Sequence, residues 1–316
     1  MNRKFWLNLS LINGIGNSTL HKLYDFMQAN SLSEEDIFSD KIKNEIYNLF
    51  NKKQIDLIFS YKNNFQNSKK INNRLIEKNI TALFVFDKEY PSILKNNLKT
   101  QAPFVLYLKG NISLLKEQKI CVVGTRNPSE ISINAAYKCV KTLSEMNYTI
   151  ISGGAIGIDT IAHLSALNNE GKTIFILPYG LMNFNPPPFS RKLINSANSL
   201  IISQFHPYQS WNAGCAIMRN MTMAAISSTV IVAETGISGG TQHTANFALK
   251  LNKPLIVFDF NNTKLKQPSG NNYLINNKLC ISSPVEMLKD ELQKIPSFIK
   301  SYRKDNIPKI QMSLLS

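Results

Sequence analysis

The sequence predicts an α/β fold in which a doubly wound, mostly parallel sheet is joined to a small all-α domain at the N-terminus. Three observations lead to this fold class. Short apolar runs alternate with amphipathic stretches between residues 120 and 258, the runs are apolar at consecutive positions, and the first 75 residues show helical periodicity without a proline. Strands that are apolar at every position are typical of a parallel sheet that helices cover on both faces.

The N-terminal segment, residues 1–75, is polar and rich in Asn and Lys, and we expect it to form a helical domain. Gly14-Ile15-Gly16 predicts a tight turn, and Ser18 predicts the N-cap of a helix that carries Leu20 and Leu23. This pattern favours an ordinary turn between two helices, and it also occurs in a helix-hairpin-helix unit whose backbone amides face a DNA phosphate. The sequence leaves both interpretations open.

The predicted sheet domain covers residues 76–290. Two β-like runs, 80–86 and 104–108, come before the regular alternation. The six runs that we expect to be buried parallel strands are 120–123, 149–151, 173–177, 200–202, 229–232 and 255–258. Residues 291–316 are predicted to be a basic tail with too few apolar residues for a domain, and no winged-helix domain is expected there.

Two of the intervening helices carry an apolar stripe at helical spacing, which predicts the face that each helix turns toward the sheet. The first stripe consists of Ala136, Cys139, Val140 and Leu143, and the second consists of Ile217, Met221, Ala224 and Ala225.

The charge balance favours an anionic partner. With 36 Lys and Arg residues against 21 Asp and Glu residues, the formal net charge is +15, which attracts polyanions such as nucleic acid, although it also serves plain solubility. The four cysteines lie far apart without metal-ligand spacing, and they predict reduced thiols in a cytoplasmic protein. No apolar run is long enough to cross a bilayer, so we expect no membrane partner.

Three glycine-rich loops follow the predicted strands 120–123, 149–151 and 229–232. In an open parallel sheet, ligands bind outside the carboxyl ends of the strands, where helix N-termini present free amides. Glycine lets the backbone approach a ligand, and neighbouring hydroxyls add donors. One such loop is explained by a strand-to-helix turn, whereas three at one edge predict a phosphate site. Its predicted residues are Gly124, Thr125, Arg126, Ser152, Gly153, Gly154, Gly157, Ser238, Gly239 and Thr241.

Three charged residues at this edge have distinct expected roles. Arg126 is the candidate for a bidentate phosphate contact, because a guanidinium fork matches phosphate oxygens. Asp159 follows the second loop, where capping of the next helix is the favoured role. Glu234, at the end of strand 229–232, is the one carboxylate placed to act chemically, although an ion pair or a helix cap explains it equally well.

The sequence predicts no catalytic set, no metal site and no cofactor, and therefore a protein that is not an enzyme. Gly171-Lys172-Thr173 matches the end of an ATP-binding loop, but Ala166 occupies the position of the required first glycine and a strand follows. The turn at Gly124 has one glycine where a dinucleotide fingerprint needs three. The histidines show no metal-ligand spacing, and the sequence contains no nucleophile elbow.

Across residues 80–260 the sequence contains a collinear series of motifs. They include Tyr90-Pro91, Val122-Val123-Gly124-Thr125-Arg126, Ser152-Gly153, Gly157-Ile158-Asp159, Arg219-Asn220 and Ser238-Gly239. In this series the sequence resembles the DNA-processing protein A (DprA/Smf) family. The resemblance implies a sterile-alpha-motif-like N-terminal domain and a Rossmann-like domain that binds single-stranded DNA without catalysis. It further implies a homodimer that helps load a RecA-type recombinase during DNA uptake, transformation and recombination, with Arg219 and Asn220 added to the DNA site.

The sequence departs from the family pattern where the DNA is expected to lie. Ile156 stands in place of an arginine, Ala216 in place of a phenylalanine expected to contact a base, and Met221 in place of a second arginine. Residues 183–188 also lack the family's Tyr-Pro pair. Each missing phosphate contact lowers the slope of log affinity against log salt concentration by about 0.7 for a single strand. We therefore expect weaker binding than in a typical member. The candidates that would compensate are Phe184, Phe189, Lys192 and Trp211.

An alternative interpretation is a nucleotide-sensing or nucleoside-phosphate-hydrolysing protein of the lysine-decarboxylase-like group, which shares a Rossmann-like fold. The glycine-rich signature of that group ends in a glutamate. Here Gly239-Gly240-Thr241 is followed by Gln242-His243-Thr244, which contains none. A third interpretation is a scaffold whose loops no longer bind a ligand. The motifs favour the DNA-binding interpretation over these two.

Overall fold

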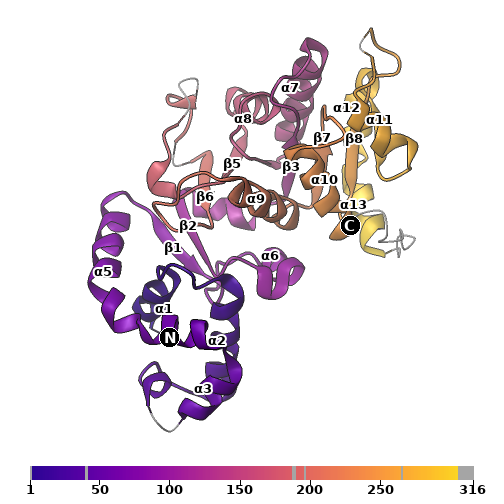
Figure 1. The fold of residues 1–316 in the computed structure, drawn as a ribbon. Helices are drawn as coiled ribbons and strands as arrows, with labels where there is room; N and C mark the ends of the chain where they lie inside the picture. The colour runs from indigo at the N-terminus through magenta and orange to yellow at the C-terminus, as the bar shows by residue number, and fades with distance from the viewer. Residues whose placement is uncertain (1, 40–41, 187–189, 196, 265, 305–316) are drawn as a thin grey trace.

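The computed structural model describes residues 2–304 apart from 40–41, 187–189, 196 and 265. Among these residues, nine strands form one sheet in the order β1-β2-β6-β5-β4-β3-β7-β8-β9, with helices against both faces (Figure 1). The strands from β6 to β9 in this order run parallel, while β1 and β2 pair antiparallel at one edge. The predicted α/β class with a doubly wound, mostly parallel sheet is confirmed.

The N-terminal domain is helical, as predicted. Its elements are α1 (Arg3–Ser10), α2 (Asn17–Ala29), η1 (Asp36–Phe38), α3 (Lys43–Leu49), α4 (Lys52–Phe59) and α5 (Tyr61–Glu77). The expected N-cap at Ser18 is wrong, because α2 begins at Asn17 and its cap position is Gly16. The side chain of Asn17 instead accepts a hydrogen bond from the backbone N–H of Phe104, at 3.0 Å, and so joins the helix to the sheet domain.

All six predicted buried strands are present, with ends shifted by no more than one residue. They are β3 (Lys119–Val123), β4 (Thr149–Ser152), β5 (Lys172–Leu177), β6 (Ser199–Ser203), β7 (Thr229–Val232) and β8 (Leu255–Asp259). The two earlier runs become β1 (Thr81–Phe84) and β2 (Val105–Gly110). Strand β9 (Ile281–Pro284) is missing from the sequence prediction, because Ser282, Ser283 and Pro284 leave it without an apolar run.

Alternate residues of the central strands face two separate apolar cores. Ile120 and Val122 of β3 lie in one core, and Cys121 and Val123 lie in the other. The first core is covered by α7 (Glu130–Glu145) and α8 (Ile158–Asn168), and the second by α6 (Ser92–Leu98), α9 (Ala213–Ile226) and α10 (Gly240–Lys250). Both faces of the sheet are therefore buried, which explains why its strands are apolar at consecutive positions.

The two predicted helix stripes have different outcomes. The stripe on α7 is confirmed, since Ala136, Cys139, Val140 and Leu143 are all buried. The stripe on α9 is partly wrong, because Ile217 is 40% exposed. The buried face of α9 includes Cys215, Arg219, Thr222, Met223 and Ile226. Two of these residues are polar, so a search for apolar periodicity places the buried face at the wrong angle around the helix.

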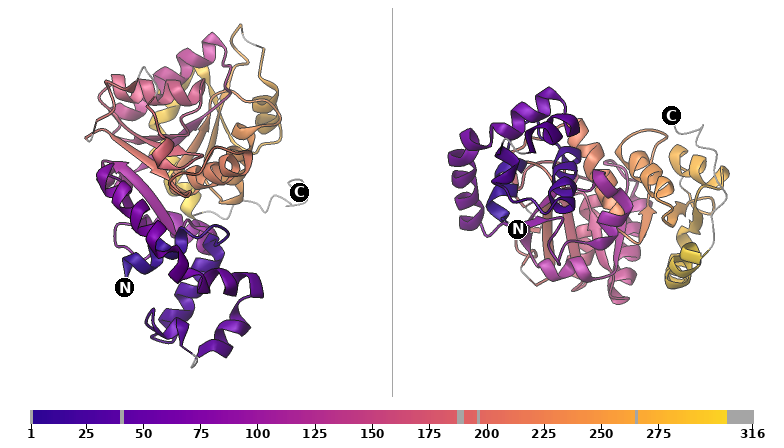
Figure 2. Two further views of the ribbon diagram at one scale, coloured as in Figure 1. Left: turned by 60° about the vertical axis from the view of Figure 1, so that its left-hand side comes forward. Right: turned by 90° about the horizontal axis from the view of Figure 1, so that it is seen from below.

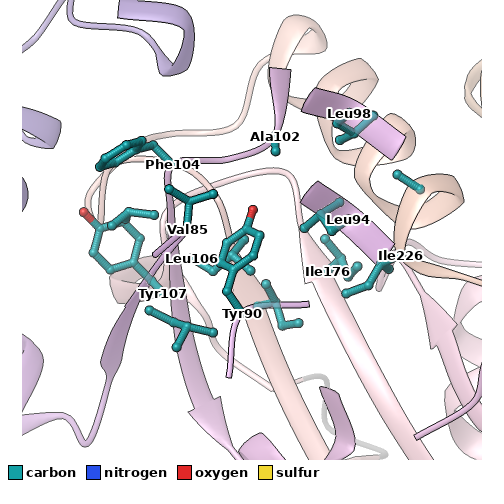
Figure 3. Close-up of a cluster of buried hydrophobic side chains, with 14 of the residues drawn as sticks. Val85, Tyr90, Leu94, Leu98, Ala102, Phe104, Leu106, Tyr107, Ile176 and Ile226 are labelled. Carbon is teal, nitrogen blue, oxygen red and sulfur yellow. The ribbon is translucent and has the colours of Figure 1, made fainter. Parts of the chain in front are cut away.

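The N-terminal domain packs against β1 and β2 through a shared aromatic core. The ring centroids of Trp6 in α1 and Phe104 beside β2 lie 5.0 Å apart, and both side chains are buried. Figure 3 shows Phe104 with Val85 and Tyr107 in this core. Figure 2 shows the helical domain against this edge of the sheet. The helical unit and the sheet therefore share one apolar interior, and the predicted boundary near residue 75 stays a prediction.

The C-terminal helices lie at the opposite edge of the sheet (Figure 1). They are α11 (Ser269–Asn276), the 3-10 helix η7 (Val285–Met287), α12 (Leu288–Gln293) and α13 (Ile295–Lys304). The described part of the predicted tail, 291–304, is helical apart from one residue, and Leu292 and Ile295 are buried in the core that α7 covers. Residues 305–316 lie outside the described residues. No helix in the described ranges has both the length and the apolar character that crossing a membrane requires.

Candidate nucleic-acid interface

The loops after β3 and β7 meet at the point where the winding of the sheet reverses. After β3 the chain enters α7 on one face, whereas after β7 it enters α10 on the other. The backbone N–H of Thr125 donates to the carbonyl of Glu234 at 2.7 Å, and the Glu234 carboxylate accepts from the N–H and the hydroxyl of Ser129, both at 2.9 Å. Ser129 is the N-cap of α7. Glu234 therefore supports a helix cap at the crevice where such sheets bind ligands.

The loop after β4 is held against the loop after β3 by Gly157. This glycine has φ +84°, and a Cβ built on it would lie 2.3 Å from the carbonyl oxygen of Thr125. The next residue, Ile158, donates its backbone N–H to the same carbonyl at 3.2 Å. Only glycine combines a positive φ with so close an approach. Gly157 thus joins two of the three predicted phosphate loops into one surface.

Arg219 lies beneath the loop after β4 rather than on its surface. It is 7% exposed, and its Nη1 donates to the carbonyl of Ile176 at 3.0 Å. A Cβ on Gly153 would lie 1.6 Å from that nitrogen, so the glycine leaves room for the guanidinium group. Sequence reasoning misses this support because a backbone carbonyl acceptor has no sequence signal. A direct phosphate contact from Arg219 stays a prediction.

Asp159 ties down the same loop. Its Oδ2 accepts from the backbone N–H groups of Gly153 at 3.2 Å and Ala155 at 3.3 Å. The expected role as the cap of α8 is wrong, because the cap position is Gly157 and the carboxylate reaches back to the preceding loop. Burial raises the pKa of Asp159, and the nearby charge of Arg219 opposes that shift. Asp159 and Arg219 are thus a buried, oppositely charged pair beneath the loop, and the carboxylate of Asp159 holds the loop in place.

His163, which is buried near Arg219, is neutral near pH 7. The Nδ1 of His163 lies 2.7 Å from the hydroxyl oxygen of Thr173, and its ring stacks on Phe175 with centroids 3.5 Å apart. Burial and the charge of Arg219 lower the pKa of His163 to about 3. A general base has its pKa near the working pH, so His163 is unsuited to proton transfer there.

Two other predicted ligand residues are bonded to the main chain. The Ser152 hydroxyl donates to the carbonyl of Val122 at 2.7 Å, and the Asn220 Nδ2 donates to the carbonyl of Gly240 at 3.0 Å. Ser152 and Asn220 are both buried. Ser152 fixes the end of β4 to β3, and Asn220 fixes α9 to the first residue of α10. Their contacts shape the edge, and a role in binding a ligand stays a prediction.

The groups that face solvent at this edge are suited to an anion. Arg126 is exposed, and within the described residues no hydrogen bond or ion pair engages its side chain. Helix α10 begins after Gly239, which has φ +110°, and no side chain caps its first amides. Such amides carry partial positive charge. Arg126, Gly154, Ser238 and Gly239 are exposed, and Gly124, Thr125, Gly157 and Thr241 are half-buried.

The positions where the sequence departs from the family also lie at this edge. Ile156, in the loop after β4, is 67% exposed, whereas Ala216 and Met221 on α9 are half-buried. Among the compensating candidates, Trp211 and Lys192 are exposed, and Phe184 is half-buried with its ring centroid 6.2 Å from that of Phe175. Phe189 lies outside the described residues, as do residues 187 and 188 of the stretch without Tyr-Pro.

Two pockets lie at the amino ends of the central strands, away from the glycine loops, which follow the carboxyl ends. They have volumes of about 530 and 450 Å³ and share Ser92, Ile93, Ser228 and Ile299 in their linings. Lys119, at the amino end of β3, lines the larger one. Neither pocket is lined by a residue of the three glycine loops. The pockets therefore do not mark the edge that carries the anion-binding groups.

Residues 81–293 match the family described as DNA recombination-mediator protein A. The chain belongs to this family. The match begins at β1 and ends with α12, so it includes all nine strands and the three glycine loops. It confirms the family resemblance that the motifs indicate. The predicted phosphate-site residues all fall within the matched range.

Individual relatives agree with this membership. The chain is 37% identical over 150 residues to the DNA processing protein DprA of Streptococcus pneumoniae, a match that covers 47% of this chain and 53% of the relative. It is 28% identical over 300 residues to the protein Smf of Synechocystis, covering 92% of this chain and 73% of that protein. The chain thus spans about half the length of the pneumococcal relative that it matches.

Solved structures show the same fold. The crystal structure of Streptococcus pneumoniae DprA superposes with a TM-score of 0.71 at 23% identity, covering 89% of this chain and 95% of that one. The structure of Helicobacter pylori DprA, solved for its single-stranded DNA binding mode, gives a TM-score of 0.58 at 27% identity and covers 69% of this chain and 96% of that one.

Proposed function

We propose that this chain binds single-stranded DNA as a DprA/Smf-type protein in DNA uptake, transformation and recombination. The observation that carries the proposal is the gathering of three glycine-rich loops at one sheet edge, beside the exposed Arg126 and the uncapped start of α10. Membership of the DNA recombination-mediator protein A family and the DNA-binding mode of the Helicobacter pylori relative support it.

The physical basis of the proposed binding is contact with phosphates. The net charge of +15 attracts the strand, and binding releases counterions, so affinity falls as salt rises. Arg126 presents a planar fork that suits two phosphate oxygens. The first amides of α10 supply donors and the positive end of the helix dipole. Gly157 keeps the loops after β3 and β4 close together, so that neighbouring phosphates of one strand can contact both loops.

The proposal assigns no catalytic role to this edge. Four of its polar side chains are engaged in structural hydrogen bonds, because Ser152, Asp159, Asn220 and Glu234 all bond to main-chain groups. The alternative of nucleoside-phosphate hydrolysis would need a free carboxylate here, and Glu234 already supports the cap of α7. A cytoplasmic homodimer that passes the bound strand to a RecA-type recombinase completes the proposal and follows from the family resemblance.

The test is a fluorescence-anisotropy titration of a labelled oligothymidylate at low and high salt. We expect Arg126→Ala to weaken binding about tenfold, as for removal of one charge-assisted hydrogen-bonding group. The salt slope should fall by about 0.7 for each phosphate that is no longer neutralised. Lys250→Ala is the matched control, because it removes one exposed cation at the far end of α10.

Three results would count against the proposal. Absence of binding by the full chain at low salt would contradict it outright. Equal weakening by Arg126→Ala and Lys250→Ala would mean that net charge alone attracts the strand and that the glycine loops are not the site. Release of a free base from nucleoside monophosphates would favour the hydrolase alternative instead.

A further inference from the structure

Apolar side chains that face solvent are concentrated around the glycine loops. Within the described residues, six of the eleven large apolar side chains that are exposed lie at this edge. We name these six the apolar rim: Ile156, Tyr208, Trp211, Ile217, Met218 and Ile237. They come from the loop after β4, the stretch after β6, the start of α9 and the loop after β7. Clustered apolar exposure of this kind marks an interaction surface, whereas single exposed residues need no explanation.

Backbone proximity and a hydrogen bond connect the apolar rim to the phosphate-binding groups. Ile156 directly precedes Gly157, whose Cβ position would lie 2.7 Å from the Cα of Arg126. On the other side, Asn220 bonds the carbonyl of Gly240, which places α9 and its exposed Ile217 next to the start of α10. Exposed apolar side chains therefore lie beside the groups that are suited to binding an anion.

Trp211 is the largest member of the rim, and residues on both sides of it in the sequence form hydrogen bonds. It is 55% exposed and directly precedes Asn212, whose side chain caps α9 by accepting from the N–H of Cys215 at 2.8 Å. Two residues earlier, the Gln209 carbonyl accepts from the N–H of Gly180 at 2.8 Å. Trp211 lies two residues before the start of α9, and Arg219, which underlies the glycine loop, lies about 9 Å along that helix at a rise of about 1.5 Å per residue.

A ligand for this surface must carry both negative charge and flat apolar groups. Single-stranded nucleic acid has this chemistry, since each phosphate alternates with a base whose face stacks on aromatic side chains. Its binding sites span several nucleotides, so a strand held at the glycine loops can extend to an aromatic side chain just before the N-terminus of α9. We propose that the apolar rim contacts the bases of the bound strand and that Trp211 is its base-stacking residue. This inference rests on the proposed DNA-binding function and adds the residue that holds the bases.

A second copy of the chain fits this surface less well. Two identical edges placed face to face would bring the exposed Arg126 of each copy to the same interface, where like charges repel. Face-to-face contact would also bury Arg126, which within the described residues has no acidic partner. Burial of an unpaired cation is costly. A polyanion satisfies both the exposed charge and the apolar groups.

The test uses the intrinsic fluorescence of the full chain. The sequence contains two tryptophans, and Trp6 is 1% exposed in the aromatic core, so a quenching ligand reports on Trp211. We expect an oligothymidylate to quench the emission of the wild-type protein, and an abasic strand of equal length and charge to bind more weakly without quenching. Trp211→Phe should abolish the quenching, and Trp211→Ala should weaken binding about tenfold. Tyr47→Ala, an equally exposed aromatic on α3, is the control and should have no effect.

The outcomes separate this inference from the proposed function. Equal binding of the normal and abasic strands, with unchanged Trp211 emission, would overturn the stacking role while the DNA-binding function stands. Absence of binding by either strand would overturn both. A Trp211 emission that changes with protein concentration alone, without DNA, would overturn the inference in favour of a second copy as the occupant. The strand comparison needs only the wild-type protein, so it does not depend on how well a variant folds.

Discussion

At the scale of single residues, the candidate site depends on a backbone conformation that one glycine makes possible. Gly157 has φ +84°, a region that side chains rarely adopt, and its Cα lies so close to the loop after β3 that a Cβ would approach the Thr125 carbonyl to 2.3 Å. A larger residue would be strained by its own φ and would push the two loops apart. Stability and DNA binding should therefore respond together to a change here.

We expect Gly157→Ala to lower the free energy of unfolding by about 1–3 kcal/mol and to weaken binding of an oligothymidylate. Urea denaturation and anisotropy titration measure the two effects. Gly236→Ala is the control at the same edge, because a Cβ there would meet only the Ser238 carbonyl at 3.8 Å. If Gly157→Ala were as stable and as tightly bound as Gly236→Ala, the close approach of the two loops would not be part of the site.

The residue types at the site can be predicted from sequence, but their individual roles cannot. Glycines after apolar strands, with Arg126 among them, predict where an anion would bind, and the structure brings these loops together. Arg219 and Ser152 have the same chemical character in the sequence as Arg126 and Ser238. Their burial depends on backbone carbonyls of Ile176 and Val122, which are remote in sequence. A pattern of side chains does not encode such acceptors.

At the scale of elements, α8 is joined to β5 by a buried histidine. His163 stacks on Phe175 and its Nδ1 lies 2.7 Å from the Thr173 hydroxyl, both on β5. Its pKa falls from an ordinary value of 6.5 to about 3, because burial and the charge of Arg219 disfavour the protonated ring. As the pH falls, His163 is therefore protonated near pH 6.5 in the unfolded chain but only near pH 3 in the folded chain. Acid thus favours the unfolded state through this residue.

The unfolding free energy of the wild-type protein should fall as the pH drops below about 6.5, with His163 contributing up to about 1.4 kcal/mol per pH unit. Urea denaturation at a series of pH values gives this slope. His163→Gln should flatten it, leaving the part due to His21 and His206, whose pKa values burial also lowers. The exposed His243→Gln variant controls for the loss of a histidine as such. An unchanged slope in His163→Gln would contradict the assignment.

Elements of the sheet differ in how far the sequence predicts them. The strands from β3 to β8 follow from continuous apolar runs, because burial on both faces requires them. Strand β9 has no such run, since only Ser283 in it is buried and the strand lies at the sheet edge. Apolar periodicity misplaces the buried face of α9 for a related reason. Arg219, through Nη1, and Thr222 on that face form hydrogen bonds to partners that only the folded chain provides.

At the scale of the whole molecule, the helical domain and the sheet share one apolar core. Trp6 and Phe104 meet across the boundary between them, and both are buried. The Asn17 side chain adds a hydrogen bond to the backbone of Phe104. Units that share a core in this way are expected to unfold together, which is not evident from the composition change near residue 75.

Phe104→Ala should lower stability by about 3–5 kcal/mol, as for removal of a buried aromatic side chain. In the wild-type protein, urea unfolding followed by tryptophan fluorescence and by far-ultraviolet circular dichroism should give coincident curves. In Phe104→Ala, made in a Trp211→Phe background, the curves should separate, because Trp6 then reports on the helical domain alone and the dichroism on the whole chain. Separate transitions in the wild type would contradict a shared core.

Phosphate contacts at the glycine-rich edge are the basis of the proposed binding of single-stranded DNA. The most direct measurement is the anisotropy titration of the full chain with an oligothymidylate at two salt concentrations, with duplex of the same length as competitor. We expect salt-dependent binding with which the duplex competes poorly, and a salt slope that falls in Arg126→Ala by about 0.7 per phosphate no longer neutralised. Binding that is absent at low salt, or a slope that Arg126→Ala leaves unchanged, would contradict it.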